Sequence, residues 1–105
     1  MATSAEWHES RASLSEAALD FSRAIKSLQE ELEAVDWYNQ RAQATQDAEL
    51  RRILMHNRNE EIEHAMMVLE YLRRQDPVFN EHMRTYLFRA GDIVAIEQAA
   101  DDPAP

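Results

Sequence analysis

The stretch LSEAALDFSRAIKSLQEELEAV, residues 14–35, carries apolar side chains at alternating steps of four and three residues. The positions of this repeat are Leu14, Ala18, Phe21, Ile25, Leu28, Leu32 and Val35. Such a repeat places an apolar stripe along one side of an α-helix and is typical of an antiparallel helix pair or a coiled coil. A helix that continues to Gln43 is about 45 Å long, which is too long for one similar helix to bury it within a globular monomer.

Two starting points are open for this first helix. Ser13 and Glu16 have the spacing of a capping box, in which a serine and a glutamate three residues later bond free backbone N–H groups. Trp7, however, lies one heptad before the start of the apolar repeat, which moves the beginning of the helix towards Ser4. We therefore predict that residues 1–12 form a partly helical N-terminal segment.

A turn and a second helix follow the first one. Asp47, within ATQDAEL at residues 44–50, is the predicted N-cap of the second helix. The seam positions of that helix are Leu50, Leu54, Asn57, Glu61, His64, Val68 and either Tyr71 or Leu72. Asp76 and Pro77 then have the pattern of a cap and a first helical position, so residues 77–88 form either a third helix or a kinked continuation of the second.

The C-terminal part is expected to be short and helical. Gly91 ends the preceding segment, and Asp92 caps a last helix before a frayed tail, DDPAP, at residues 101–105. The predicted organisation is thus a helical hairpin over residues 13–88, followed by a short helix and a disordered tail over residues 89–105.

Composition supports an all-α fold and limits the chemistry. The 105 residues are 45% hydrophobic with one Gly and three Pro, which suits continuous helices. There is no cysteine, so a metal site would be built from Glu, Asp and His. With 20 acidic and 11 basic residues the net charge is −9, which argues against nucleic acid or anionic membrane partners. No apolar run is long enough for a membrane span and no signal peptide is evident, so we expect a cytoplasmic protein.

The second helix has more than one apolar face. Its further face consists of Met55, Ile62, Met66 and Leu69. A hairpin of two long helices gives each helix only one neighbour, so these residues would stay exposed in a single chain. We therefore predict that two chains form a dimer with a four-helix bundle.

Three ionisable residues occupy positions that the repeat assigns to the core. Glu31 lies within the first apolar stripe, while Glu61 and His64 lie three residues apart on one face of the second helix. Burial of such groups without partners costs several kcal/mol. Glu31 lies about 14 residues before the turn and Glu61 about 16 after it, so the two are expected at nearly the same height in the hairpin.

These residues admit a metal site or structural ion pairs. Two chains would supply four carboxylates and two imidazoles, which is the ligand set of a di-iron carboxylate bundle. Another di-metal bundle enzyme, such as an oxygenase or manganese catalase, and a non-catalytic helical assembly module remain alternatives. Oxygen and nitrogen ligands also bind zinc, manganese and copper, so the residues alone do not choose the metal. His56 is expected to form a surface pair with Glu60 or Glu63.

Three longer segments resemble one family. EELEAVDWYNQRA (residues 30–42), HNRNEEIEHAMMVLEYLRR (56–74) and HMRTYLF (82–88) are similar to the encapsulated ferritin family, and the resemblance extends over residues 13–96. It implies a half-ferritin of two long helices, a ferroxidase centre at the interface of two subunits and dimers that assemble into a ring-shaped decamer.

The resemblance also implies roles for single residues. Glu31, Glu61 and His64 would be the iron ligands of the di-iron centre, with Glu61 as the bridging carboxylate and Tyr38 beside the centre. Glu61 and His64 belong to the second of the three segments, and Glu31 and Tyr38 to the first.

A second metal site is implied on the path by which iron enters. Glu30, Glu33 and Trp37 match the outer, metal-attracting site of the family. The two glutamates lie nearly one turn apart on a face distinct from that of Glu31. Calcium is a candidate for this site because it is a hard cation that prefers oxygen ligands. From the residues alone, a solvated acidic edge is the alternative.

The implied function is oxidation of Fe(II) by dioxygen. Members of the family are typically cargo of an encapsulin shell, which stores the ferric mineral, and a C-terminal peptide addresses them to it. No such peptide is visible in DDPAP. The expected location, in the cytoplasm within an encapsulin nanocompartment, therefore depends on the resemblance.

Overall fold

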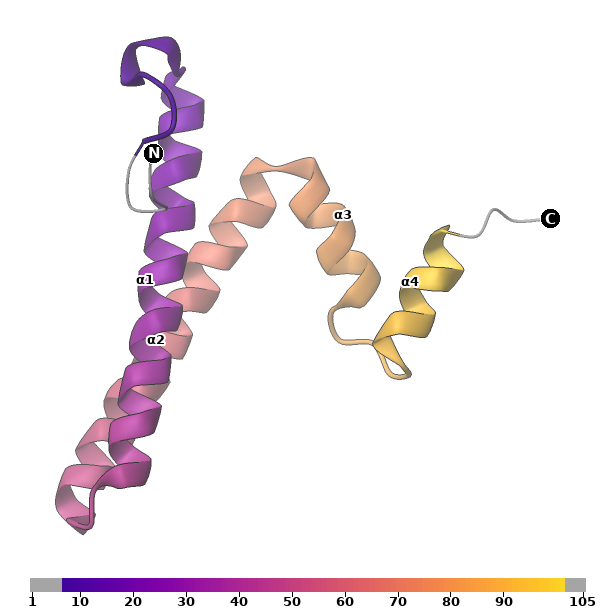
Figure 1. Cartoon of the computed structure of the whole chain (residues 1–105). Coiled ribbons are helices and arrows are strands. Elements are labelled where there is room, and N and C mark those ends of the chain that lie inside the picture. Colours follow the sequence, from indigo (N-terminus) through magenta and orange to yellow (C-terminus); the bar gives the residue numbers. More distant parts are fainter. Residues whose placement is uncertain (1–6, 102–105) are drawn as a thin grey trace. The chain divides into compact units, whose positions relative to one another are not determined.

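The structure, a computed structural model, describes residues 7–101, and every regular element in that range is helical. Figure 1 shows a 3₁₀ turn η1 (Arg11–Ser13) and the helices α1 (Glu16–Ala44), α2 (Ala48–Gln75), α3 (Pro77–Tyr86) and α4 (Ile93–Asp101). The prediction of an all-α fold is confirmed. The predicted start of the first helix near Ser4 and the end of the tail lie outside the described residues.

The chain divides into two compact units, and the boundary lies within α2. One unit ends at Glu70 and contains α1 and most of α2. The other begins at Tyr71 and contains the last turns of α2 together with α3 and α4. None of the helices in residues 7–101 is both long and apolar enough to span a membrane.

The first helix begins later than either predicted start. Ser15 is its N-cap, because the Ser15 side chain accepts a hydrogen bond of 3.1 Å from the N–H of Ala18. Ser13 belongs to η1, and its hydroxyl donates to the carbonyl of Ser10. The predicted capping box at Ser13 was therefore wrong, because the extended backbone at Leu14 separates η1 from α1.

Trp7 does not extend the helix either. It lies outside regular structure and is partly exposed, with the guanidinium carbon of Arg11 at 5.4 Å from its ring centroid. A cation over an aromatic face is a stabilising contact that needs no helix. Trp7 therefore makes a local contact with Arg11 and is not part of α1.

A short turn joins α1 to α2 and fixes them as an antiparallel pair. The carboxylate of Asp47 accepts a 3.0 Å hydrogen bond from the N–H of Leu50, which confirms Asp47 as the N-cap of α2. Arg51 donates from Nε to the carbonyl of Ala42 at 3.0 Å and from its terminal nitrogen to the carbonyl of Thr45. These bonds satisfy carbonyl groups at the C-terminus of α1, which have no partner within the helix.

Alanines and Leu19 occupy the buried positions of the hairpin. Ala42 and Ala65 have no exposed surface and Ala24 is also buried. Side chains of this size allow two helix backbones to approach closely. The predicted stripe on α1 is only partly correct, because Phe21 and Leu32 remain exposed. The buried residues of this helix are Leu19, Ala24 and Ala42.

Many large apolar side chains of the first unit remain exposed. Among the described residues they are Trp7, Phe21, Leu32, Trp37, Leu50, Ile53, Met66 and Met67, each with 37–65% of its surface accessible. Large apolar side chains exposed in this number on one hairpin indicate surface that another chain can cover. Of the second apolar face predicted for α2, Met66 is exposed, whereas Met55, Ile62 and Leu69 are half-buried.

A separate third helix follows α2. Asp76 has extended backbone angles, as expected before proline, and its carboxylate accepts hydrogen bonds from the N–H groups of Val78 and Phe79. The alternative of a third helix is thus confirmed over a kinked continuation. The helix ends at Tyr86 rather than at residue 88, because the N–H of Leu87 closes it by donating to Met83.

The start of α4 follows the prediction. Gly91 has a φ of 103°, a conformation that favours glycine. The carboxylate of Asp92 then accepts a 3.3 Å hydrogen bond from the N–H of Val94, and α4 begins at Ile93. Ile96 is the buried residue of this helix.

The last seam position of α2 was predicted to be either Tyr71 or Leu72. Leu72 is buried and Tyr71 is exposed, so Leu72 occupies this position.

We expect Ser15→Ala to lower the free energy of unfolding by about 1 kcal/mol, because it removes the side-chain cap of α1. Ser13→Ala is the matched control and should have a smaller effect, since Ser13 lies in η1. Urea unfolding followed by far-ultraviolet circular dichroism measures both. A larger loss in Ser13→Ala would instead support a helix start at Ser13.

Candidate metal centre

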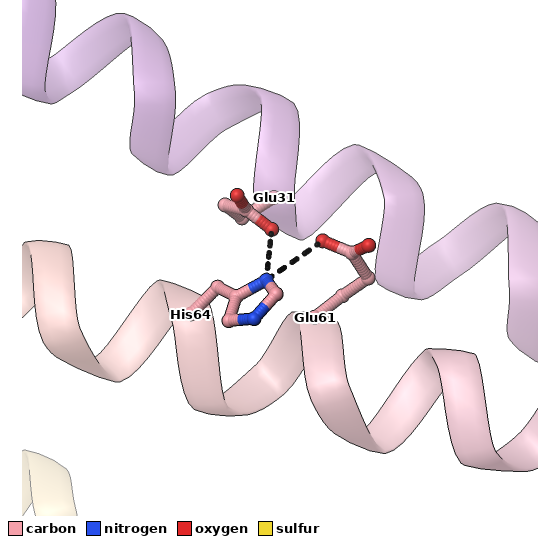
Figure 2. Close-up of side chains that lie close together, drawn as sticks. All are labelled: Glu31, Glu61 and His64. Carbon is pink, nitrogen blue, oxygen red and sulfur yellow. Dashed lines mark ion pairs between the residues drawn. The ribbon is translucent and has the colours of Figure 1, made fainter.

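Glu31 of α1 faces Glu61 and His64 of α2 across the hairpin. Figure 2 shows the three side chains directed towards one another. Nδ1 of His64 lies 3.6 Å from Oε2 of Glu31 and 3.6 Å from Oε2 of Glu61. One potential ligand atom from each residue lies within 4.8 Å of the other two. Within residues 7–101 this is the cluster of three or more such side chains that is close enough to hold a metal ion.

The local sequence explains this convergence. Glu61 and His64 are three residues apart on α2, so their side chains share one face of the helix. The short turn after Ala44 makes α1 run antiparallel to α2, which brings Glu31 to the same height. Counting residues on either side of the turn predicted that Glu31 and Glu61 lie at nearly the same height. In the structure the two residues and His64 lie together.

The two carboxyl groups are electrostatically strained without a cation. The Glu61 carboxyl, which can share a hydrogen bond with a protonated Glu31, raises the pKa of Glu31 above its ordinary value. Desolvation raises this pKa further, whereas His64 lowers it. In addition, Oε2 of Glu31 is buried and has no hydrogen-bond partner among the described residues. A cation bound between the carboxylates would remove both costs.

The donor atoms fit a divalent transition metal. Two carboxylate oxygens and one imidazole nitrogen are ligands that iron, zinc and manganese accept. Three ligands leave the coordination shell incomplete. The accessible fractions of the side chains are 26% for Glu31, 25% for Glu61 and 47% for His64, so the cluster is open on one side. The remaining positions are therefore available to water, substrate or a second protein chain.

Sequence reasoning missed Glu60 as a neighbour of the site. Oε2 of Glu60 lies 4.0 Å from Nε2 of His64, the nitrogen that faces away from the other two glutamates. This distance is too long for a hydrogen bond, so Glu60 is a charged neighbour of His64 rather than a member of the cluster. The i,i+4 spacing of Glu60 and His64 was the available signal. Glu60 also pairs with His56 at 3.7 Å, as predicted for a surface pair.

Tyr38 lies on α1, two turns after Glu31, and is half-buried. The guanidinium carbon of Arg41 lies 5.6 Å from the centroid of its ring. Tyr38 is not a member of the three-residue cluster. Its expected place beside a metal centre stays a prediction.

Glu30, Glu33 and Trp37 are exposed on α1. The structure does not place the two glutamates within the cluster, so they form a separate acidic surface. An outer metal site there also stays a prediction.

An all-helical hairpin with two carboxylates and a histidine converging between its helices defines the chain as a half-ferritin. The chain belongs to the encapsulated ferritin family, as expected from the resemblance: the family described as EncFtn-like matches residues 6–90.

Two characterised relatives share about half or more of their residues with the chain. An encapsulated ferritin-like protein of Rhodospirillum rubrum is 58% identical over 92 residues, which cover 88% of this chain and 66% of the relative. A ferritin-like protein of Thermotoga maritima is 50% identical over 93 residues, covering 89% of this chain and 82% of the relative. The chain thus spans about two thirds of the length of the Rhodospirillum relative.

A solved structure has the same fold. The crystal structure of a protein from Nitrosomonas europaea matches with a TM-score of 0.81 and 53% sequence identity. The match covers 83% of this chain and 96% of the Nitrosomonas chain. The helical fold is therefore also that of a solved protein structure.

We expect Glu31→Gln to stabilise the metal-free protein at neutral pH or leave it unchanged. Because the folded-state pKa of Glu31 is raised, the stability that the carboxyl contributes is present below its ordinary pKa and is lost as pH rises through the raised value. The variant and the unchanged chain should therefore converge in stability under acid conditions. Urea unfolding in the presence of a chelator, at neutral and at acid pH, measures this difference.

The same substitution should remove stabilisation by added metal, because it removes a ligand charge. Glu63→Gln is the control, since Glu63 is exposed on α2 and outside the cluster. Lower metal-free stability of Glu31→Gln at neutral pH than at acid pH, relative to the unchanged chain, would contradict the proposed repulsion.

Proposed function

We propose that this chain is a ferroxidase that oxidises Fe(II) with dioxygen at a di-iron centre formed between two copies of the hairpin. The observation that carries the proposal is the cluster of Glu31, Glu61 and His64, which is open on one side and contains a buried carboxylate oxygen without a hydrogen-bond partner. Membership of the encapsulated ferritin family supports an iron-related function.

Charge and ligand number favour two copies. One chain offers two carboxylates and one imidazole, so two chains offer four carboxylates and two imidazoles. Four negative charges balance two Fe(II) ions, and six side chains can hold two metals while leaving room for oxygen. The exposed apolar side chains of the first unit supply the surface that a second hairpin would cover.

The residues then have distinct roles. Glu31 and His64 would hold one Fe(II) on each side of the dimer, and Glu61 of each copy would be the carboxylate shared by the two metal positions. Oxidation would take one electron from each of two Fe(II) ions, and dioxygen would accept both electrons with two protons from water to give hydrogen peroxide. The two ferric ions carry two more positive charges than the four carboxylates neutralise, which favours hydroxide from water or departure of the product. Tyr38 would lie beside this centre.

An outer site would concentrate the substrate. Glu30, Glu33 and Trp37 are exposed, and the two carboxylates attract Fe(II) by electrostatic steering. Calcium is a further candidate ion for this site, because it prefers oxygen ligands.

The proposed assembly is a dimer as the functional unit within a ring-shaped decamer. The proposed partner is an encapsulin shell, in which the ferric product is stored as mineral, inside a cytoplasmic nanocompartment. The similarity to the Rhodospirillum relative, an encapsulated ferritin-like protein, supports this location.

The first experiment is anaerobic addition of Fe(II) to the metal-free protein, followed by native mass spectrometry and then by air while ferric absorbance is recorded. We expect two irons per pair of chains and oxidation faster than in a protein-free control. Glu61→Ala and His64→Ala should abolish the fast phase and retain helicity, while Glu63→Ala should keep it. A chain that binds no iron and leaves the oxidation rate unchanged would support a structural assembly module instead.

A permanently bound pair of metals that turns over an added organic substrate or hydrogen peroxide would support another di-metal enzyme. Zinc should inhibit iron oxidation, because it binds oxygen and nitrogen ligands more tightly than Fe(II). This competition distinguishes occupancy of the cluster from oxidation in free solution.

The outer site predicts a defect that depends on iron concentration. The double variant Glu30→Gln and Glu33→Gln should slow oxidation at low Fe(II) and approach the unchanged rate at high Fe(II), since it weakens attraction but keeps the cluster. Glu49→Gln is a control for loss of an exposed acidic charge elsewhere in the hairpin. Initial rates over a range of Fe(II) at low ionic strength measure the effect, and an equal slowing at all concentrations would contradict the assignment.

A further inference from the structure

Phe88 combines two unfavourable features in the second unit. Its φ is 60°, within the left-handed region, where a bulky residue is a clear outlier. Its side chain is also fully exposed, at 105% of the reference surface. An aromatic ring held in water by a strained backbone indicates that the ring has a use outside its own chain.

A cavity of about 420 Å³ lies between α3 and α4 in the same unit. Its lining consists of His82, Tyr86, Ile93, Val94 and Glu97. Ile93 and Val94 are exposed at 68% and 59%, so the apolar side of the cavity is accessible from outside. The rings of His82 and Tyr86 stack at a centroid distance of 6.4 Å and form an aromatic wall.

The charges around the cavity are complementary to those beside Phe88. Glu97 lines the cavity, and both Glu97 and Asp101 act on Tyr86. Burial raises the pKa of the Tyr86 phenol, and the negative charges of Glu97 and Asp101 raise it further. Arg89 follows Phe88 directly and is exposed. An apolar ring next to a cation therefore matches an apolar cavity with an acidic rim.

We propose that Phe88 of one copy inserts into the cavity between α3 and α4 of a second copy, where Arg89 pairs with Glu97. Phe88 does not fill the cavity of its own chain, because its side chain is fully exposed. An aromatic ring is a strong anchor, since it buries about 150–250 Å² when it enters a pocket. The inserting residue and the receiving cavity are different surfaces, so the contact can link chains head to tail and close a ring.

This contact goes beyond the proposed ferroxidase function. Phe88 and the cavity belong to the unit that begins at Tyr71, whereas Glu31, Glu61 and His64 belong to the other unit. Loss of the Phe88 contact should therefore reduce assembly size and leave the binding of iron intact. An experiment can therefore contradict the Phe88 contact without contradicting the ferroxidase function, and the reverse.

The test uses Phe88→Asn in the full chain, because asparagine tolerates the left-handed region while removing the ring. Sedimentation velocity over a concentration series, with chelator and with anaerobic Fe(II), measures assembly. We expect association between larger units to weaken at least ~10-fold, as for loss of an interface anchor, with two irons still bound per pair of chains. Val78→Asn is the control, since Val78 is exposed on α3 but does not line the cavity. An unchanged mass for Phe88→Asn, or an equal loss in Val78→Asn, overturns the proposal.

A mixing experiment tests the two halves of the contact. Val94→Trp should fill the cavity and leave Phe88 in place, so this variant and Phe88→Asn should each fail to form the large assembly. Mixing them should give a new complex, because one variant retains the ring and the other retains the cavity. Absence of a mixed complex from two helical, folded variants overturns the proposal.

The charge pair gives a further check. Arg89→Glu and Glu97→Arg should each weaken assembly, and the double variant should restore it, since the pair is re-formed with reversed charges. Circular dichroism verifies that all three are helical. No recovery in the double variant overturns the assigned pairing of Arg89 with Glu97.

Discussion

Two carboxylates, Glu31 and Glu61, meet across the contact between α1 and α2 with a single imidazole beside them. Their repulsion opposes the same helix contact that the buried alanines favour. A proton on Glu31, or a cation between the helices, would relieve this repulsion. This constraint relates fold to function, because the residues that strain the apo hairpin are those that would bind metal.

A second constraint is the shortage of covered apolar surface. Two helices joined by a short turn can bury alanines at their contact, but large side chains such as Leu32, Ile53 and Met67 remain in water. The partly open cluster and this uncovered surface are both features of the first unit. In the proposed dimer, a second hairpin would complete the proposed set of metal ligands and cover the apolar side chains in one association step.

Sequence reasoning was accurate where local chemistry decides structure. Asp47, Asp76 and Asp92 were identified as caps. A carboxylate directly before a helix accepts hydrogen bonds from the free N–H groups of the first turn. The convergence of Glu31 with His64 followed from counting along two regular helices. Reasoning failed at Ser13, where an extended Leu14 interrupts the helix, and at Phe21, because periodicity does not reveal which apolar residues a narrow contact covers. Phe88 had no periodic signal, since its conformation lies outside any helix.

The brevity of the turn held by Arg51 has a consequence for the order of assembly. Only residues 45–47 separate α1 from α2, so closing the hairpin costs little loop entropy. The contacts nearest the turn join residues that are close in sequence. Such contacts form within microseconds to milliseconds, whereas association of chains is slower and depends on concentration. Each newly made chain would thus hold its own three ligands in register before it meets another. The rate of encounter, rather than the rate of folding, would then determine how soon a complete centre exists.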